Sequence, residues 1–571
     1  MKNAINKTLF YILSSPFCLT VLFFTLTLLF FTPIYDENDD VSILRMASGY
    51  YSGSPSPLLV YINPLYGLLL VKLYRFFPDI AWYGILFLAI LFIGLYFTLR
   101  FIFSITQGLL LRFTEIVYIM PFYFYATVFV QYTTVASVAA YTGFIIVCQG
   151  VLNPKNLSVR LILVGTFLIF LAGLIRDNVL FYVTLLSIPL LIFSFFDSRS
   201  VVNKRILAGS LIIIFILFLL SKLYSGIVYS KSEDWRSHMT WISNLQAYHY
   251  GYYITEYTKN KDLYDDIGWS KNDYLMFLHW FYTDESRFSP KKVRTITEYA
   301  IAHQLSFNGM KSTIKMTLNQ FATHSLIVVT FLSFQGILVY YIVFQKRKAI
   351  FYYLAILALG AGFIIFFSFL GRLLPARFMH PLLFILSLYS LFIISKAYCI
   401  GKRGASRFLV FLCLGYLLVL LVQFVLIAHL NNTKTAHFAK ILDELPQNVL
   451  IFNWDSSLPM QWINVFDNLH KFDNLDIAGT GWPQRSPYDK ALLAKYNITD
   501  LYQDMIDNPN VYLVATPTYL RYLRTYIKDH YGKQIQIDSI KDFTKYEVWP
   551  RYGYGASLVQ IKSKLNVSSA H

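Results

Sequence analysis

The sequence predicts a mainly α-helical membrane protein, in which a polytopic bundle of transmembrane helices is followed by a small extracytoplasmic α/β domain. Three observations support this fold class. Of 571 residues, 56% are hydrophobic and only 14% are charged, against roughly a quarter charged in a soluble domain. The 50 Phe and 44 Tyr residues are typical of aromatic belts at bilayer interfaces. Apolar runs of about 20 residues, the length that crosses the hydrocarbon core, recur along most of the chain.

About eleven of these runs are long enough to be transmembrane spans. The first run, residues 9–32, is too long for the apolar region of a signal peptide and lacks a cleavage site of small residues. We therefore expect it to remain as a membrane anchor. The predicted spans are 9–32, 80–104, 109–130, 133–152, 158–175, 177–196, 205–228, 323–345, 349–370, 378–397 and 407–429.

A further apolar run, residues 58–71, is too short for a span and contains Asn63-Pro64. We expect it to lie along the outer face, because only then do the basic clusters between the spans share the side of the N-terminus. The positive-inside rule makes that side cytoplasmic. Three segments then face outward, namely the loops 34–79 and 229–320 and the C-terminal region 430–571.

The chain therefore divides into a membrane domain, residues 1–429, and an outer domain, residues 430–571. In the outer domain short β-rich runs alternate with helical stretches, which is typical of a small α/β domain. The loop 229–320 has helical periodicity and many aromatic residues, which predict interfacial helices. The predicted strands of the outer domain are 449–452, 475–478, 511–515 and 559–561, and its predicted helices are 486–496 and 517–530.

Several other functional classes are disfavoured. The net charge of +17 does not indicate nucleic-acid binding, because the basic residues lie in short clusters between apolar runs and form no single stripe. The cysteines lie in or beside apolar runs, which predicts neither a disulfide framework nor a CxxC metal site. Gly479-Thr-Gly481 lacks the third glycine of a dinucleotide fingerprint, so we expect a turn there. The cysteines are Cys18, Cys148, Cys399 and Cys413.

The first outer loop carries a group of candidate catalytic carboxylates directly after the first span: Asp36, Glu37, Asp39 and Asp40. A carboxylate held at the membrane surface can take a proton from an acceptor hydroxyl or amine. The loop could instead hold a divalent cation, Mg²⁺ or Mn²⁺. The alternative is a solvated acidic loop that helps to set the topology, although Asp and Glu contribute little to topology.

Candidate phosphate-binding residues lie at the outer ends of later spans. Arg176 separates two apolar runs, and Arg372, Arg377 and His380 lie together between two others. Ionisable residues at such depth are costly and are functional candidates, and the planar guanidinium can bind a phosphate through two hydrogen bonds. The alternative is that these side chains snorkel from helix ends to the interface. With the acidic loop on the same face, the set suits a lipid phosphate leaving group and a nucleophile that needs a base.

These motifs together resemble the GT-C glycosyltransferases, a superfamily that includes protein O-mannosyltransferases and the aminoarabinose transferase of lipid A. The resemblance covers the membrane region. It is carried by the acidic pair Asp39-Asp40, or Asp36-Glu37, by the Pro-containing segment Pro55-Ser-Pro57-Leu-Leu, and by Arg377-Phe378 followed by Pro381. The Pro-containing segment lacks the lysine of the family pattern. The region from Pro121 to Thr134 also lacks the second-loop Asp of many relatives, which disfavours a metal mechanism that relies on it.

The resemblance implies an inverting glycosyltransferase that takes a sugar from a polyprenyl-phosphate carrier. In that reading Asp39 acts as base or orients the acceptor, and Arg377, with Arg372 or Arg176 and with His380, binds the lipid phosphate. We expect a bacterial cytoplasmic membrane, contact with membrane lipids, no nucleic-acid partner, and a glycan, lipid, wall polymer or protein as acceptor. A polysaccharide polymerase or ligase, which needs no acidic pair, and a lipid-linked-sugar transporter are the alternatives.

Overall fold

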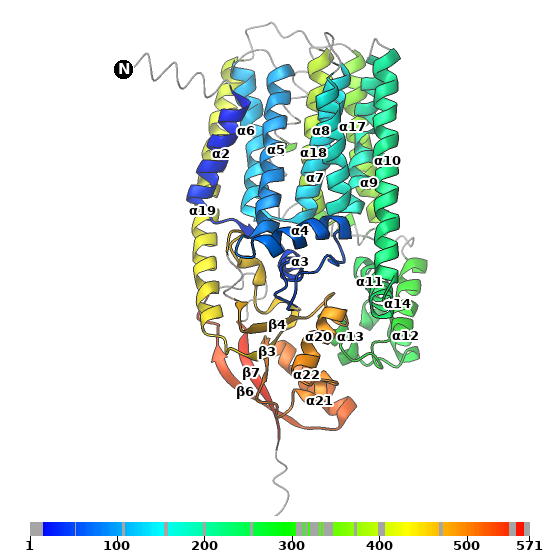
Figure 1. Ribbon diagram of the computed structural model, residues 1–571, viewed down its shortest axis with the longest axis vertical. Coiled ribbons are helices and arrows are strands. Elements are labelled where there is room, and N and C mark those ends of the chain that lie inside the picture. The colour runs from blue at the N-terminus through cyan, green and yellow to red at the C-terminus, as the bar shows by residue number, and fades with distance from the viewer. Residues whose placement is uncertain are drawn as a thin grey trace, which may run out of the picture.

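The computed structural model shows a bundle of long helices with a smaller mixed domain at one end (Figure 1). The predicted span 323–345 falls almost wholly outside the described residues, and the candidate Arg372 lies outside them. The structure describes residues 15–564 apart from 52, 106–108, 153–157, 198–200, 252–254, most of 304–346, 370–373, 398–405, 468–471 and 547–554.

The bundle helices run side by side, which confirms the mainly helical class (Figure 1). Five of them, α5, α7, α9, α10 and α19, are long and apolar enough to cross a membrane by length and composition. Each predicted span in the described part of the chain corresponds to one helix, although α19 extends well past the predicted end at residue 429. The bundle helices are α2 (Pro16–Phe30), α5 (Trp82–Ile105), α6 (Leu109–Val128), α7 (Tyr132–Leu152), α8 (Val159–Ile175), α9 (Asp177–Asp197), α10 (Val201–Ser230), α17 (Arg347–Phe369), α18 (Ala376–Ala397) and α19 (Ser406–Asp443).

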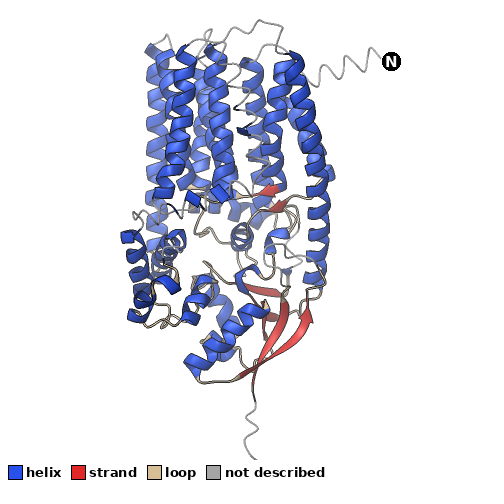
Figure 2. Cartoon of the chain, turned by 180° about the vertical axis from the view of Figure 1, so that it is seen from behind, coloured by secondary structure: helices blue, strands red, loops and turns tan. Residues whose placement is uncertain are grey.

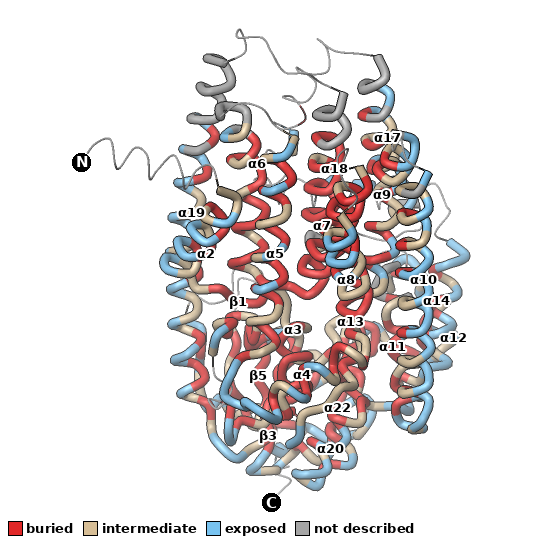
Figure 3. Tube along the Cα trace, turned by 45° about the horizontal axis from the view of Figure 1, so that its top comes forward, coloured by how far each residue is buried: buried red, intermediate tan, exposed pale blue. Residues whose placement is uncertain are grey.

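Helix α7 forms the core of the bundle and is buried along nearly its whole length. It packs closely on α8 at two glycines. A Cβ added to Gly143 would lie 2.6 Å from the Gly165 carbonyl oxygen, and one added to Gly165 would lie 2.7 Å from that of Gly143. Small residues allow this close approach of two backbones within a membrane. By contrast, α10 and α19 expose most of their apolar side chains (Figure 3), as expected for surfaces that face lipid.

A layer of short elements lies across the outer end of the bundle. Helix α3 (Asn38–Ser48) and helix α4 (Pro64–Phe76) lie between the bundle and the mixed domain (Figure 1). The segment 58–71, which was expected to lie along this face, becomes helical from Pro64. The Asn63 side chain caps this helix by accepting a hydrogen bond from the Leu65 N–H at 3.0 Å. Strand β1 (Ile34–Tyr35) pairs in parallel with β2 (Phe129–Val130), which places the start of α3 beside the start of α7.

The C-terminal part contains a five-stranded sheet in the order β4-β3-β5-β7-β6 (Figure 2). The four predicted strands are confirmed. Strand β6 was not predicted, because this edge strand is largely exposed and lacks an apolar run. Helix α19 continues through the predicted domain boundary at 429/430 to Asp443, so the sheet begins with β3. The strands are β3 (Val449–Asn453), β4 (Leu475–Gly479), β5 (Val511–Ala515), β6 (Ile535–Asp542) and β7 (Ser557–Ser563), and the helices are α20 (Pro487–Lys495), α21 (Leu501–Asp504) and α22 (Pro517–Tyr531).

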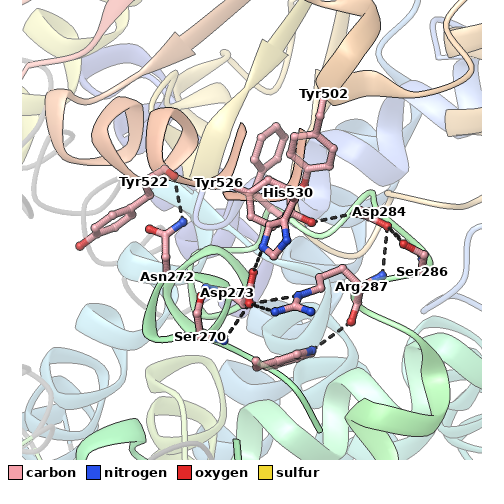
Figure 4. A network of polar contacts seen from close by, with 12 residues as sticks. Ser270, Asn272, Asp273, Asp284, Ser286, Arg287, Tyr502, Tyr522, Tyr526 and His530 are labelled. Atoms are coloured by element: carbon pink, nitrogen blue, oxygen red, sulfur yellow. Dashed lines mark hydrogen bonds and ion pairs between the residues drawn. The ribbon is translucent and has the colours of Figure 1, made fainter. Parts of the chain in front are cut away.

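The described part of the loop 229–320 folds into helices that pack against the sheet domain. A buried polar network joins the two parts (Figure 4). Asp273 accepts hydrogen bonds from Arg287 Nε at 3.0 Å and lies 2.7 Å from Nε2 of His530 on α22, while Asp284 accepts from the Tyr526 hydroxyl at 2.8 Å. The loop helices are α11 (Glu233–Gly251), η1 (Tyr257–Lys259), α12 (Lys261–Asp266), α13 (Lys271–Leu278) and α14 (Pro290–His303).

Candidate functional site

A cavity of about 370 Å³ lies where helix α3, one end of the helix bundle, the loop 229–320 and the sheet domain meet. Helix α3 begins immediately after Glu37, its N-cap, and ends at Gly49, whose φ of 97° only glycine adopts readily. Carboxylates in the first turn favour the positive end of the helix dipole. The lining residues come from three parts of the chain and include Glu37, Asn38, Asp39, Arg45, Tyr61, Tyr132, Arg176, Gln246, Trp280, Arg377, Asp455, Thr480, Gly481 and Trp482.

Two of the predicted carboxylates meet a predicted arginine in this cavity. Arg377 Nη1 lies 3.5 Å from Glu37 Oε1 and 3.8 Å from Asp39 Oδ2. The other oxygen of Asp39 accepts a hydrogen bond from Trp482 Nε1–H at 2.9 Å. The first outer loop, the start of α18 and the sheet domain therefore converge on one carboxylate. Asp39 and Arg377, which are far apart in the sequence, therefore lie side by side in the fold.

The other two carboxylates of the loop point away from the cavity lining. Asp40 is fully buried, and its Oδ1 accepts hydrogen bonds from the Tyr83 hydroxyl at 2.9 Å and the Tyr132 N–H at 3.0 Å. Burial raises the pKa of Asp40 well above its ordinary value, and these two hydrogen bonds lower it only in part. Asp36 accepts from the Tyr125 hydroxyl at 3.1 Å. The geometry therefore gives Asp40 and Asp36 contacts that hold α3 on the bundle.

Arg176 lies at the junction of two cavities. It is the C-cap of α8, in an extended conformation that turns the chain directly into α9. Its guanidinium carbon lies 4.9 Å from the centroid of the Tyr61 ring and 5.2 Å from that of Tyr132, so cation–π contacts hold it. The adjoining cavity, about 290 Å³, shares Tyr61 and Arg176 and is also lined by Asp177 and Lys222, which form an ion pair.

His380 lies one turn after Arg377 on α18 but is buried behind the cavity lining. Its ring meets the edge of the Tyr125 ring, with 4.7 Å between centroids. The structure thus brings together Glu37, Asp39, Arg176 and Arg377 at the cavity, and sets His380 with Asp36 around Tyr125.

Sequence reasoning missed the wall of the cavity that the sheet domain supplies. Asp455 follows β3, and Thr480 and Trp482 follow β4. The turn predicted at Gly479-Thr-Gly481 occurs there and forms part of this wall. Arg45 was also missed. It is buried, burial lowers its pKa, and its Nη1 donates to the Ile477 carbonyl at 2.8 Å, which ties α3 to β4. The only sequence signal for this wall was that the turns at Asp455 and Thr480 each follow a predicted strand.

The charges that line the cavity balance, with the carboxylates of Glu37, Asp39 and Asp455 against three arginines, Arg45, Arg176 and Arg377. Such a site can hold an anionic phosphate on its arginines and a neutral hydroxyl on a carboxylate. Within the described residues, the structure shows no group of three or more His, Cys, Asp or Glu side chains arranged to hold a metal ion.

Comparison with known proteins gives two solved structures. No family model matches the chain, and no curated protein matches it. The chain is similar to ArnT from Cupriavidus metallidurans in the apo state, at 10% identity and a TM-score of 0.36. It is similar to the same protein bound to undecaprenyl phosphate, at 11% identity and a TM-score of 0.38. Each match covers 94% of this chain and 97% of the other. These TM-scores are too low to carry residues from one chain to the other.

Proposed function

We propose that this protein is a membrane glycosyltransferase that moves a sugar from a polyprenyl-phosphate carrier to a cell-surface acceptor on the non-cytoplasmic face. The observation that carries the proposal is the meeting of Asp39, Glu37 and Arg377 in one cavity at the end of the helix bundle. A lipid headgroup at the bilayer surface can reach this position while its tail stays between the spans. A base and a phosphate-binding cation are the two groups that the reaction needs.

In the proposed reaction the acceptor hydroxyl attacks the anomeric carbon of the donor sugar from the face opposite the phosphate. A bond forms between the acceptor oxygen and that carbon, and the bond from the carbon to the phosphate oxygen breaks. Asp39 takes the hydroxyl proton as general base. Arg377 and Arg176 stabilise the negative charge that develops on the leaving phosphate. The products are the glycosylated acceptor, with inverted configuration, and the polyprenyl phosphate.

The remaining candidates support this chemistry from the cavity wall or behind it. Glu37 shares the Arg377 guanidinium with Asp39, so a phosphate that binds Arg377 would free the Asp39 carboxylate to act as base. Asp40 and Asp36 act as positioning residues through their tyrosine contacts. A divalent cation stays a prediction, with Glu37 and Asp39 as its ligands. Titration of Mg²⁺ or Mn²⁺ into metal-depleted enzyme measures that requirement.

The proposed location is a bacterial cytoplasmic membrane, with a cytoplasmic N-terminus and the sheet domain outside. The basic clusters between the spans support this orientation through the positive-inside rule. Reaction of engineered cysteines near the N-terminus and in the sheet domain with a membrane-impermeant thiol reagent in intact cells tests it. Labelling of the N-terminal cysteine alone would contradict it.

The direct test is transfer of a labelled sugar from synthetic polyprenyl-phosphate donors by the purified protein. We expect Asp39→Asn and Arg377→Ala each to lower the rate by about 10²- to 10⁴-fold. Matched controls are Asp262→Asn and Arg294→Ala, which change exposed residues outside the cavity and should keep full activity. Full activity in Asp39→Asn would remove the base and favour the polymerase or ligase alternative.

A further inference from the structure

The wall of the cavity opposite the membrane bundle is built around an aspartate in a strained conformation. Asp455 has φ 44° and ψ 49°, and Ser456 after it has φ 59°. Two consecutive non-glycine residues in the left-handed region persist only where their surroundings hold them. The Asp455 N–H donates to the Thr480 hydroxyl at 2.6 Å, and the Asn453 side chain bonds both polar backbone groups of Leu458. The turn is therefore held from both sides.

The strained turn directs the Asp455 carboxylate, and neighbouring side chains then fix it. Its Oδ2 accepts a hydrogen bond from the Tyr519 hydroxyl at 2.6 Å and lies 3.1 Å from His279 Nδ1. Asp455 lines the cavity. Within the described part of the chain, its second oxygen, Oδ1, makes no hydrogen bond. One oxygen is thus used for positioning, and the other keeps its capacity to accept a hydrogen bond.

Aromatic rings line the same cavity as this carboxylate. Trp280 and Trp482 line the same cavity, and the Tyr61 ring meets Trp482 edge-on with 5.0 Å between centroids. Trp280 also has a positive φ, 62°, and its carbonyl accepts a hydrogen bond from the Gly481 N–H at 3.1 Å. Aromatic faces bind the apolar C–H faces of a sugar ring, and a carboxylate oxygen accepts bonds from its hydroxyls. The volume of about 370 Å³ lies in the range of small-ligand sites.

The same turn is tied to the proposed base. The Asn38 side chain bonds the Ser456 hydroxyl, and its Oδ1 accepts from the Gln461 N–H at 2.9 Å. Asn38 directly precedes Asp39, so these contacts tie the Asp455 turn to the start of the helix that carries the proposed base. A donor phosphate would occupy Arg176 and Arg377. The three carboxylates of the cavity then face Arg45 alone, and this negative surplus disfavours an anionic ligand.

We infer that the sheet-domain wall is the acceptor subsite, that Asp455 binds acceptor hydroxyls through Oδ1, and that the acceptor is a carbohydrate. This inference rests on the proposed function. It makes the sheet domain part of the substrate site, and it gives Asp455 a role in acceptor binding while the proton transfer stays with Asp39.

The test compares Asp455→Asn with a matched control, Asp507→Asn. Both aspartates lie in the sheet domain at positive φ, which asparagine tolerates well, and Asp507 lies outside the cavity. Purified full-length protein is applied to an array of immobilised oligosaccharides. Transfer from a synthetic polyprenyl-phosphate sugar is then measured with oligosaccharide, peptide and aminolipid acceptors. We expect Asp455→Asn to weaken array binding and to raise the acceptor KM by about 10- to 100-fold, with the donor KM unchanged, while Asp507→Asn matches the wild type.

Two results would overturn the inference. One is identical array binding and acceptor KM in the two variants. The other is transfer by the wild type to peptides or aminolipids but to no oligosaccharide. In both cases, loss of transfer in Asp39→Asn would leave the proposed function standing. Conversely, Asp455-dependent array binding without transfer from any polyprenyl-phosphate donor would support the carbohydrate subsite and refute the donor assignment.

Discussion

Raising the pH from 5 to 8 should destabilise the contact between the sheet domain and the first outer loop, and Asp489→Asn should remove most of that effect. Asp489 is buried in the first turn of α20, where its Oδ2 accepts from the Arg485 N–H at 3.0 Å. Within the described residues Oδ1 has no partner. Burial raises the pKa of Asp489 from its ordinary 3.8 to about 7, and the Arg485 hydrogen bond and charge lower it only in part.

The sign follows from proton linkage. Between about pH 4 and pH 7 the folded state keeps the Asp489 proton and the unfolded state has lost it, so stability falls as the pH rises. Each pH unit in this window costs about 1.4 kcal/mol. The rise from pH 5 to pH 8 therefore costs about 3 kcal/mol, which corresponds to a fall of about 5–10 °C in the melting temperature of a domain of this size. Asparagine is neutral throughout and has no such penalty.

The assay is thermal unfolding of the purified protein in detergent at pH 5 and pH 8, followed by hydrogen exchange of α20. Other groups also titrate, so the informative quantity is the difference between Asp489→Asn and the wild type at each pH. We expect the melting temperature of the variant, relative to that of the wild type, to rise with pH. Tyr488 donates to the Leu58 carbonyl at 3.0 Å, so the same loosening should appear at the first loop. A difference that is constant with pH would refute a buried, protonated Asp489.

Three further predictions follow from other contacts. Trp482→Phe keeps a ring beside Tyr61 but removes the hydrogen bond to Asp39. The kcat should therefore fall about tenfold with the donor KM unchanged, and an unchanged kcat in steady-state kinetics would count against this positioning. Asp273→Asn should destabilise the folded loop and its contact with α22 by about 3 kcal/mol, because Arg287 in the loop and His530 on α22 both lose a buried partner. Burial raises the pKa of Asp273, but the hydrogen bonds from Arg287 and Ser270 and the charges of Arg287 and His530 together outweigh it. The net pKa is lowered, and this stability should be lost only below about pH 4 in thermal scans. Gly143→Val should lower the melting temperature and the yield of inserted protein, because its side chain would meet the α8 backbone, whereas Gly209→Val, with nothing within 4 Å of its Cβ, should not.

Local sequence patterns were sufficient for most of the helices and strands. Apolar runs must become helices in a bilayer, because every backbone N–H and C=O there needs an internal partner. The predicted spans in the described residues accordingly became α2, α5 to α10 and α17 to α19. Short β-rich runs in the C-terminal part became β3, β4, β5 and β7. Strand β6 was not predicted, because only one of its residues is buried and the strand therefore contains no apolar run.

The sequence alone also placed a carboxylate loop and two arginines on one face, but it could not rank the carboxylates. Consecutive residues on a helix point about 100° apart, so Asp39 faces the cavity while Asp40 faces Tyr83 in the core. That choice depends on where α3 begins and on which side packs on the bundle. Both are set by contacts with residues far along the chain, including the hydrogen bond of Asp39 to Trp482.

Only the tertiary structure decided that the sheet domain completes the site. Asp455 is one acidic residue after a short strand, and no local pattern distinguishes it from other turn residues. Its importance comes from a left-handed backbone held by Thr480, and from the docking of its turn on Asn38. Hydrophobic periodicity is a property of neighbouring residues, and so it can be read from the chain. The cavity is a property of residues hundreds of positions apart, and it exists only once the sheet domain and the helix bundle are packed together.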